Sequence, residues 1–259
     1  MLDWFHLSAH PYLNRSYPLG ASGMGSSGLE TTNTETGVSV VIAAYNEADR
    51  IAQTVQVILD LPHLLEIIVV DDGSTDETAL VAGAAGAQVI KMGRNRGKGQ
   101  ALNAGISKVR GDIILMLDAD LASSAVEADK LLEPVFRDEA DLVIAGFPVV
   151  PGRGGGMGLV VRLARWGIKR MTGERYQWPL SGQRAIRRHV LQSLLPLERG
   201  FGVEVAMTIG ALRKGARVVE VQTGMDHRVT GWSWRDRAHR ARQFCDVAVT
   251  LLRCSVRGR

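Results

Sequence analysis

One segment constrains the fold of this chain more than any other, and it runs from Asp112 to Leu121. Five consecutive apolar residues, 113–117, lead directly into Asp118 and Asp120. An apolar run of this length, bounded by polar residues, predicts a strand that is buried on both faces of a sheet. Because alternate residues of a strand point to the same side, the side chains of the two aspartates should project together.

Two carboxylates at the end of a buried strand are costly unless positive charge lies between them. A divalent cation that carries phosphate oxygens would supply that charge. The alternative is that Asp118 and Asp120 are solvated loop acids or a helix cap, since Ser123 and Ser124 follow them. The Asp-x-Asp pair alone does not decide between these interpretations.

Two further apolar runs, 38–44 and 66–70, also end in polar clusters. The clusters are Tyr45 to Glu47 and Asp71 to Ser74. Helical patterns alternate with these runs, which predicts an α/β fold with a mostly parallel sheet flanked by helices. Right-handed crossovers then place the carboxyl ends of the parallel strands on one edge, where ligands bind in such sheets. The sequence therefore predicts that the three polar clusters meet in one site.

The remaining elements follow from periodicity and from local start and stop signals. Asn46 is expected to cap a helix that reaches about Leu61, and Ser74 with Glu77 has the spacing of a capping box. Further strands are expected at 88–92, 141–146 and 217–221, and further helices at 100–109, 124–137, 159–171 and 200–214. In the C-terminal helix, one apolar face is predicted to hold Phe244, Val247, Ala248, Leu251 and Leu252.

Composition supports a globular protein, with 46% hydrophobic residues and 259 residues in all. The chain shows no apolar run long enough to span a membrane, no secretory signal, and only two cysteines, Cys245 and Cys254. These features predict a cytoplasmic protein with reduced thiols. The net charge of +4 comes from the tail, because residues 228–259 hold eight Arg and two Asp. A basic tail does not indicate a nucleic-acid-binding protein.

Three regions are expected along the chain. Residues 1–36 contain no periodic apolar face and are interpreted as a flexible leader. Residues 37–231 form a single α/β domain, and residues 232–259 form a basic amphipathic C-terminal helix.

Several motifs together resemble the family-two-type nucleotide-sugar glycosyltransferases of GT-A (Rossmann-like) fold. The N-terminal motifs are AAYNEADRI (43–51), VVDDGSTDET (69–78), GKGQALNAG (97–105) and LDADL (117–121). The C-terminal motifs are PLSGQRAIRR (179–188), GFGVEVAMTIGALRKG (200–215) and HRVTG (227–231). Within this family the chain is most similar to glucosyl-3-phosphoglycerate synthases and to dolichyl-phosphate glucosyltransferases.

The resemblance implies a UDP-sugar donor, with glucose as the sugar, and a metal cofactor, Mg²⁺ or Mn²⁺. The donor would be bound by Tyr45, Glu47, Asp72, Gly73, Ser74, Lys98 and Asp118, with Asp72 accepting a hydrogen bond from uracil N3. Asp120, Asp118 and His227 would hold the metal, and Asp120 and Glu204 would act in catalysis. A metal and a lysine suit this reaction because the leaving diphosphate gains negative charge. Glu204 would accept a proton from the acceptor in an inverting reaction and orient the acceptor or the sugar in a retaining one.

The residue types also allow structural interpretations of the same positions. Lys98 can be an exposed loop lysine, His227 a structural histidine, and Glu204 an acid favoured by the helix dipole in the first turn of a helix. In the phosphoglycerate enzymes the glycine-rich loop is followed by an Arg-x-Thr that binds the acid acceptor, whereas this chain has Met157 and Gly158 there. The acceptor is therefore open between a small metabolite and a lipid phosphate.

The tail bears on the acceptor as well. Trp232 and Trp234 precede four arginines and the apolar helical face. This pattern suits peripheral contact with the inner face of a membrane. The alternative is a C-terminal helix packed on the core with a solvated basic face, and the sequence favours this alternative. The sequence allows a homodimer without requiring one.

Two other functions compete with glycosyl transfer. A sugar-phosphate nucleotidyltransferase would have a glycine-rich, basic loop after its first strand, where this chain has Tyr45 to Glu47. A non-catalytic nucleotide-sugar-binding protein would lose the metal carboxylates, and both Asp118 and Asp120 are present. The sequence therefore favours a metal-dependent glycosyltransferase.

Overall fold

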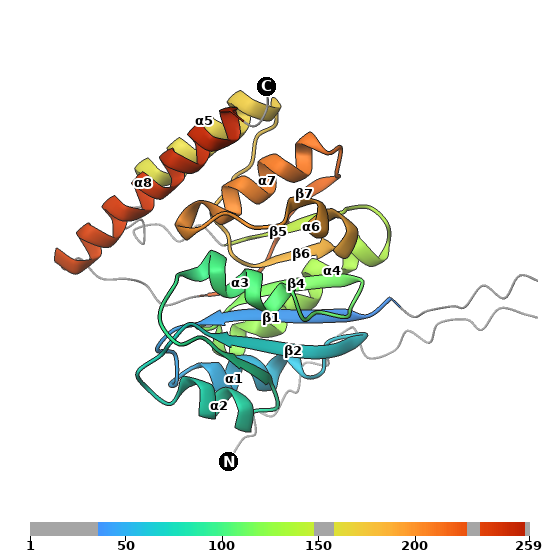
Figure 1. The fold of residues 1–259 in the computed structure, drawn as a ribbon. Coiled ribbons are helices and arrows are strands. Elements are labelled where there is room, and N and C mark those ends of the chain that lie inside the picture. Colours follow the sequence, from blue (N-terminus) through green and yellow to red (C-terminus); the bar gives the residue numbers. More distant parts are fainter. Residues whose placement is uncertain (1–35, 148–157, 227–233, 257–259) are drawn as a thin grey trace, which may run out of the picture. The chain divides into compact units, whose positions relative to one another are not determined.

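A computed structural model describes residues 36–147, 158–226 and 234–256, with the side chains of 234–240 excepted. All described elements belong to the second of two units, 35–259. They form a seven-stranded sheet in the order β3-β2-β1-β4-β6-β5-β7, with helices on both faces (Figure 1). β6 runs antiparallel to both of its neighbours and the other pairings are parallel. The predicted mostly parallel α/β sheet is confirmed.

The strands are β1 (Val38–Ala44), β2 (Leu64–Asp71), β3 (Gln88–Lys91), β4 (Ile113–Asp118), β5 (Leu142–Gly146), β6 (Arg184–Arg187) and β7 (Val218–Gln222). The helices are α1 (Ile51–Ile58), α2 (Thr78–Ala84), α3 (Lys98–Ile106), α4 (Asp129–Phe136), α5 (Gly158–Thr172), α6 (Arg188–Leu194), α7 (Val203–Arg213) and α8 (Trp234–Val256). Two 3₁₀ helices, η1 (Ala122–Ala128) and η2 (Gly200–Gly202), precede α4 and α7.

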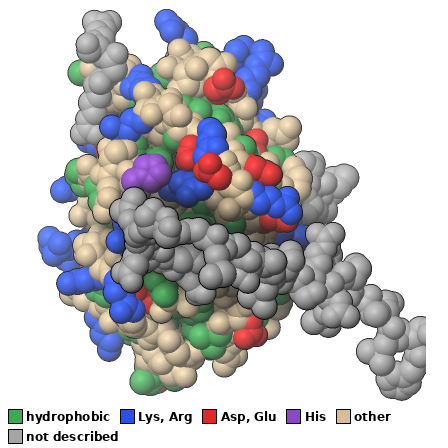
Figure 2. Space-filling view, turned by 90° about the vertical axis from the view of Figure 1, so that its right-hand side faces the viewer, with side chains coloured by type: hydrophobic (Ala, Val, Ile, Leu, Met, Phe, Trp, Pro, Cys, Tyr) green, Lys and Arg blue, Asp and Glu red, His purple; other side chains and the backbone are tan. Residues whose placement is uncertain are grey.

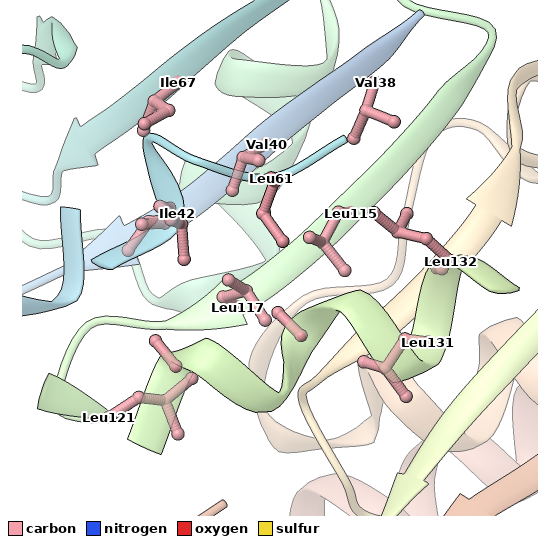
Figure 3. Packing of buried hydrophobic residues seen from close by; sticks show 14 of the residues in the cluster. Val38, Val40, Ile42, Leu61, Ile67, Leu115, Leu117, Leu121, Leu131 and Leu132 are labelled. Atoms are coloured by element: carbon pink, nitrogen blue, oxygen red, sulfur yellow. The ribbon is translucent and has the colours of Figure 1, made fainter. Parts of the chain in front are cut away.

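The sheet separates two apolar cores, and alternate side chains of the central strands are buried in each of them. Leu115 and Leu117 of β4 join the core that is covered by α1 and α4 (Figure 3). Ile114 and Met116 join the opposite core, which α3, α5, α6, α7 and α8 cover. By the same alternation, Asp118 points to the side of α3 and α7. Strand parity therefore aims this carboxylate at two particular helices.

The two predicted helix caps are wrong. α1 begins at Ile51 and α2 at Thr78, each without a side-chain cap. The Ser74 hydroxyl instead accepts a hydrogen bond from the Asn46 backbone N–H at 2.9 Å. The Asn46 side chain, on a residue with φ of 56°, accepts one from the Thr75 N–H at 2.8 Å. Contacts between the two loops have replaced the local caps.

The apolar face predicted for the C-terminal helix is divided between core and solvent. Val247 and Leu251 are buried against α5 and α7, whereas Phe244 and Leu252 are 41% and 67% exposed. Beside this buried stripe, the partly buried Asp246 accepts a hydrogen bond from the Phe201 N–H of η2 at 3.1 Å. The described part of α8 is therefore a packed element of the fold. None of the helices in the described ranges is long and apolar enough to cross a membrane.

The amino ends of β5 and β7 are joined by ion pairs. Arg217 binds both Asp138 and Asp141, and Arg187 of β6 binds the same two acids. Figure 2 shows acidic and basic side chains side by side on one face of the molecule. Mutual neutralisation makes this network structural, and it lies at the strand ends opposite to Asp118.

Candidate functional site

The carboxyl end of β4 carries an ion-paired cluster. Lys98, the first residue of α3, places its Nζ 2.6 Å from Oδ1 of Asp118 and 3.0 Å from Oε1 of Glu204. The Glu204 side chain is 9% exposed, in the first turn of α7. The structure thus brings together Lys98, Asp118 and Glu204, which lie far apart in the sequence and were linked there only by the family resemblance.

The charge state of Lys98 is fixed by its neighbours. Burial by itself would lower the pKa of the ammonium group, but Asp118 and then Glu204 attract the charged form more strongly. The pKa of Lys98 is consequently raised above its ordinary value. The two neighbouring carboxylates therefore favour the charged form of Lys98.

Two residues that sequence reasoning missed complete the surroundings of Asp118. Gln183 is 1% exposed, and its Nε2 donates a hydrogen bond to Oδ2 of Asp118 at 2.6 Å. Gly182 lies directly over the ion pair, because a Cβ at this position would be 2.3 Å from the Lys98 Nζ. The motif PLSGQR was noted in the sequence, but only the fold shows that it faces β4.

Arg184 holds this segment in place and was also missed. Its guanidinium is buried, with the residue 1% exposed, and donates hydrogen bonds to the backbone oxygens of Pro179, Ser181 and Glu204 and to the Thr208 hydroxyl. Burial lowers the pKa of Arg184 to about 10, so it stays charged at neutral pH. One arginine thus ties the segment with Gln183 to the helix with Glu204.

The loop after β2 is built around Asp72. This carboxylate is 3% exposed and accepts hydrogen bonds from the backbone N–H groups of Arg96 and Gly97, at 2.8 and 2.7 Å. Gly73 has φ of +77°, and a Cβ there would be 2.6 Å from the Arg94 backbone. Asp72 and Gly73 therefore shape the 93–97 loop that leads to Lys98. Each carboxylate oxygen has a second lone pair, so Asp72 could accept a further hydrogen bond. The hydrogen bond from uracil N3 stays a prediction.

The loop after β1 carries Tyr45 and Glu47. Tyr45 is 45% exposed, and the Glu47 N–H donates to the Thr78 hydroxyl at 2.8 Å. With the Asn46–Ser74 contact, this bond joins the loops after β1 and β2 at the same sheet edge as Asp118. The predicted convergence of the three polar clusters is confirmed, and the roles of Tyr45, Glu47 and Ser74 in binding stay predictions.

The predicted metal ligands are only partly described. Asp118 is the last residue of β4, and Asp120 follows it two residues later. His227 lies outside the described residues, as do most of the glycine-rich loop and the side chain of Trp234. Within the described ranges no three His, Cys, Asp or Glu side chains form a group that could hold a metal. The donor chemistry nevertheless fits, because carboxylate oxygens are the ligands that Mg²⁺ and Mn²⁺ prefer.

Comparison with known proteins agrees with this geometry. Residues 39–195 match the family model "Glycosyl transferase family 2". The chain is 31% identical over 191 residues to the glycosyltransferase AglJ of Haloferax volcanii, which covers 72% of this chain and 62% of that protein. It is also 31% identical over 258 residues to the glucosyl-3-phosphoglycerate synthase of Mycolicibacterium smegmatis, covering 88% of this chain and 81% of that protein.

A solved structure shares the fold. The glucosyl-3-phosphoglycerate synthase of Mycobacterium tuberculosis, in complex with Mn²⁺, UDP-glucose and phosphoglyceric acid, superposes with a TM-score of 0.71 at 29% identity. The match covers 85% of this chain and 80% of that one. The sheet and its flanking helices are thus those of the GT-A fold, and the chain belongs to glycosyl transferase family 2.

Proposed function

We propose that this chain transfers glucose from UDP-glucose, with Mg²⁺ or Mn²⁺, to an acceptor that is a small phosphorylated metabolite. The observation that carries the proposal is the cluster of Lys98, Asp118 and Glu204 at the carboxyl end of β4, two residues before Asp120. The similar synthase solved with Mn²⁺, UDP-glucose and phosphoglyceric acid supports the choice of donor, metal and acceptor class.

In this proposal Asp120, with Asp118 and His227, holds the metal. When bound, a divalent cation neutralises charge that grows on the leaving diphosphate. Lys98 would add a second positive charge of its own, and the contacts with Asp118 and Glu204 favour its charged form. Gln183 and Lys98 hold the Asp118 carboxylate in one orientation, which favours a pre-organised donor site.

Glu204 is the proposed carboxylate beside the sugar and the acceptor. Its Oε1 lies 3.0 Å from the Lys98 Nζ, so this contact orients the Glu204 side chain. An inverting reaction would use it to accept the proton of the acceptor hydroxyl, and a retaining one would use it to orient the sugar or the acceptor. The anomeric configuration of the product, read by proton NMR, decides between these roles.

The proposed function is tested by release of UDP from UDP-glucose. We expect the full chain to release UDP in the presence of Mn²⁺ and phosphoglyceric acid, whose hydroxyl takes the glucosyl group, and to lose this activity with a chelator. Asp120→Ala should lower the rate by at least about 100-fold while leaving the circular dichroism spectrum unchanged. A matched control is Glu133→Ala, which removes an exposed acid of α4 from a surface ion pair. Metal-independent activity, or full activity in Asp120→Ala, would overturn the proposal.

A lipid-phosphate acceptor is a second candidate, and the outer face of α5 and α8 favours it. α5 carries four exposed cations, Arg162, Arg165, Lys169 and Arg170, and no acid. Trp166 is 61% exposed beside them, and Leu252 of α8 is 67% exposed. A groove of about 640 Å³ lies between α5, α7 and α8. Exposed tryptophan among cations suits the surface of an anionic bilayer.

Under this second candidate the enzyme acts as a peripheral protein on the inner face of a membrane. A homodimer through this face would bring the like charges of α5 together, which opposes association. We expect the chain to sediment with vesicles of phosphatidylglycerol and not with vesicles of phosphatidylcholine. Lys169→Glu combined with Arg170→Glu should abolish the binding. Failure to bind either vesicle would contradict the lipid-phosphate acceptor. A dimer that light scattering still detects after these charge reversals would contradict it too. Either result would favour the small-metabolite acceptor.

A further inference from the structure

The backbone that carries Asp120 is tied to α1 by one buried hydroxyl. Thr54 of α1 is fully buried, and its Oγ1 donates a hydrogen bond to the Ala119 oxygen at 2.9 Å. The same Oγ1 accepts a hydrogen bond from the Ala122 N–H at 2.8 Å. A single side chain therefore bridges the residues on either side of Asp120.

A second contact, from the residue just before α1, acts on Asp120 directly. Nη1 of Arg50 donates a hydrogen bond to the Asp120 backbone oxygen at 3.1 Å. Backbone oxygens at 119 and 120 and the N–H at 122 are thus all bound by α1 or by the residue that precedes it. This helix lies about 65 residues earlier in the chain, so the contacts depend on the fold.

The turn needs such support because its backbone is unfavourable. Ala122 has φ of 49°, in the left-handed region that residues other than glycine rarely adopt. Leu121, which is 2% exposed, fills the core on one side of the turn. A strained backbone of this kind persists only where the surrounding contacts over-determine it. Thr54 supplies two of those contacts and thereby fixes the backbone on both sides of Asp120.

We propose that Thr54, assisted by Arg50, is a positioning residue for the metal ligand Asp120. The inference rests on the proposed function, because it requires a divalent cation at Asp120. Groups that orient a metal ligand without touching the metal typically contribute 10–100-fold to its affinity. Thr54 makes no contact with the reacting groups in this role and acts through the backbone of the loop.

The test is Mn²⁺ affinity in the presence of UDP, measured by the electron paramagnetic resonance signal of free Mn²⁺. Thr54→Val keeps the shape of the side chain and removes both hydrogen bonds to the 119–122 loop, together with a longer one to the Arg50 backbone oxygen at 3.3 Å. We therefore expect affinity to fall by about tenfold or more. Thr54→Ser restores the hydroxyl and should bind within about threefold of the unchanged chain. Arg50→Met provides a milder variant, with a smaller loss, should Thr54→Val fail to fold.

Ser39 provides a matched control at the far end of the sheet. Its buried hydroxyl likewise accepts a backbone N–H, from Gly111 at 2.7 Å, and donates to Glu66 at 2.7 Å. Ser39→Ala should lower the melting temperature as Thr54→Val does, without changing Mn²⁺ affinity. If Ser39→Ala weakens Mn²⁺ binding as much, general loss of stability explains the effect and the proposal is wrong.

The remaining outcomes separate this proposal from the proposed function. If Asp120→Ala binds Mn²⁺ as tightly as the unchanged chain, the metal is not held at Asp120, and both proposals fall. If Asp120→Ala loses Mn²⁺ while Thr54→Val and Arg50→Met keep full affinity, only the positioning role of α1 is overturned.

Discussion

At the scale of single residues, the site is defined by how closely a few side chains approach Asp118. Its carboxylate accepts hydrogen bonds from Lys98 and Gln183, and the backbone of Gly182 closes over the pair. The sequence predicted Asp118 as a site residue because it follows a buried apolar run. It predicted Lys98 because the motif around that residue resembles the glycosyltransferase family. Gln183 carried no local signal, since its partner is 65 residues away.

Gly182 gives a prediction at this scale. Gly182→Ala would place a Cβ 2.3 Å from the Lys98 Nζ and 2.7 Å from Oδ1 of Asp118. Both neighbours are the ends of side chains, so the fold can survive while the ion pair must move apart. We expect transferase activity to fall by at least about tenfold, because small displacements of binding groups are costly in rate. The measurement is the rate of UDP release alongside the melting temperature.

The control for this substitution is Gly83→Ala in α2. A Cβ there meets only Val89 Cγ2 at an ordinary 3.7 Å. Alanine in a helix is favoured over glycine by up to about 1 kcal/mol, so this variant should be at least as stable and fully active. Gly182→Ala with unchanged activity would show that the Lys98–Asp118 pair tolerates rearrangement.

At the scale of elements, the helices on the Asp118 side of the sheet are joined to the site by backbone contacts. α8 supplies Asp246 to the η2 backbone, which leads into α7 and Glu204. A Cβ at Gly202 would be 2.0 Å from the Thr250 hydroxyl, so α8 also lies directly on this loop. Periodicity predicted α8 and part of its buried face, but not that its polar residues contact the loop before α7.

Arg184 gives a prediction about how two elements are held together. Its guanidinium bonds to acceptors in the 179–181 segment and in α7, and lysine cannot reproduce that fork. Arg184→Lys should therefore lower the free energy of unfolding by about 2–4 kcal/mol, since buried carbonyl groups lose their donors. Urea denaturation measures the change.

Arg137→Lys serves as the comparison, because this arginine forms an exposed pair with Glu133 on the surface of α4. Surface substitutions of this kind usually change stability by less than about 0.5 kcal/mol. Equal stability of Arg184→Lys and the unchanged chain would contradict the structural role assigned to the guanidinium. A stable but inactive Arg184→Lys would instead place the residue in substrate binding.

At the scale of the whole molecule, the sequence predicted the sheet well and several of its local connections poorly. The runs at 38–44 and 113–117 are strands because their apolar residues are buried on both faces, which a single sequence reveals. Asn46 and Ser74 were assigned to helix caps from local spacing, yet they bind each other's loops. Polar residues whose partners lie far along the chain could not be placed before the fold was known.

The ion pairs at the amino ends of β5 and β7 predict how stability depends on pH. Hydrogen bonding to Arg217 is the largest cause that lowers the pKa of Asp141, to about 2. A carboxyl group whose pKa is depressed in the folded state adds stability above its unfolded pKa, near 3.9, and loses it as pH falls through the folded value. This contribution should therefore be complete above about pH 4 and vanish towards pH 2.

Arg217→Gln removes the guanidinium and should return the pKa of Asp141 towards its ordinary value. The unfolding free energy of the variant should therefore be lower than that of the unchanged chain at pH 7, and the gap should narrow below about pH 4 as Asp141 is protonated. Urea denaturation at a series of pH values measures this gap. Arg137→Gln, which breaks an exposed pair on α4, should show only a small gap at every pH. A gap for Arg217→Gln that stays constant down to pH 2 would contradict this prediction. The packing of the Arg217 side chain, and not its electrostatic attraction to Asp141, would then account for its effect on stability.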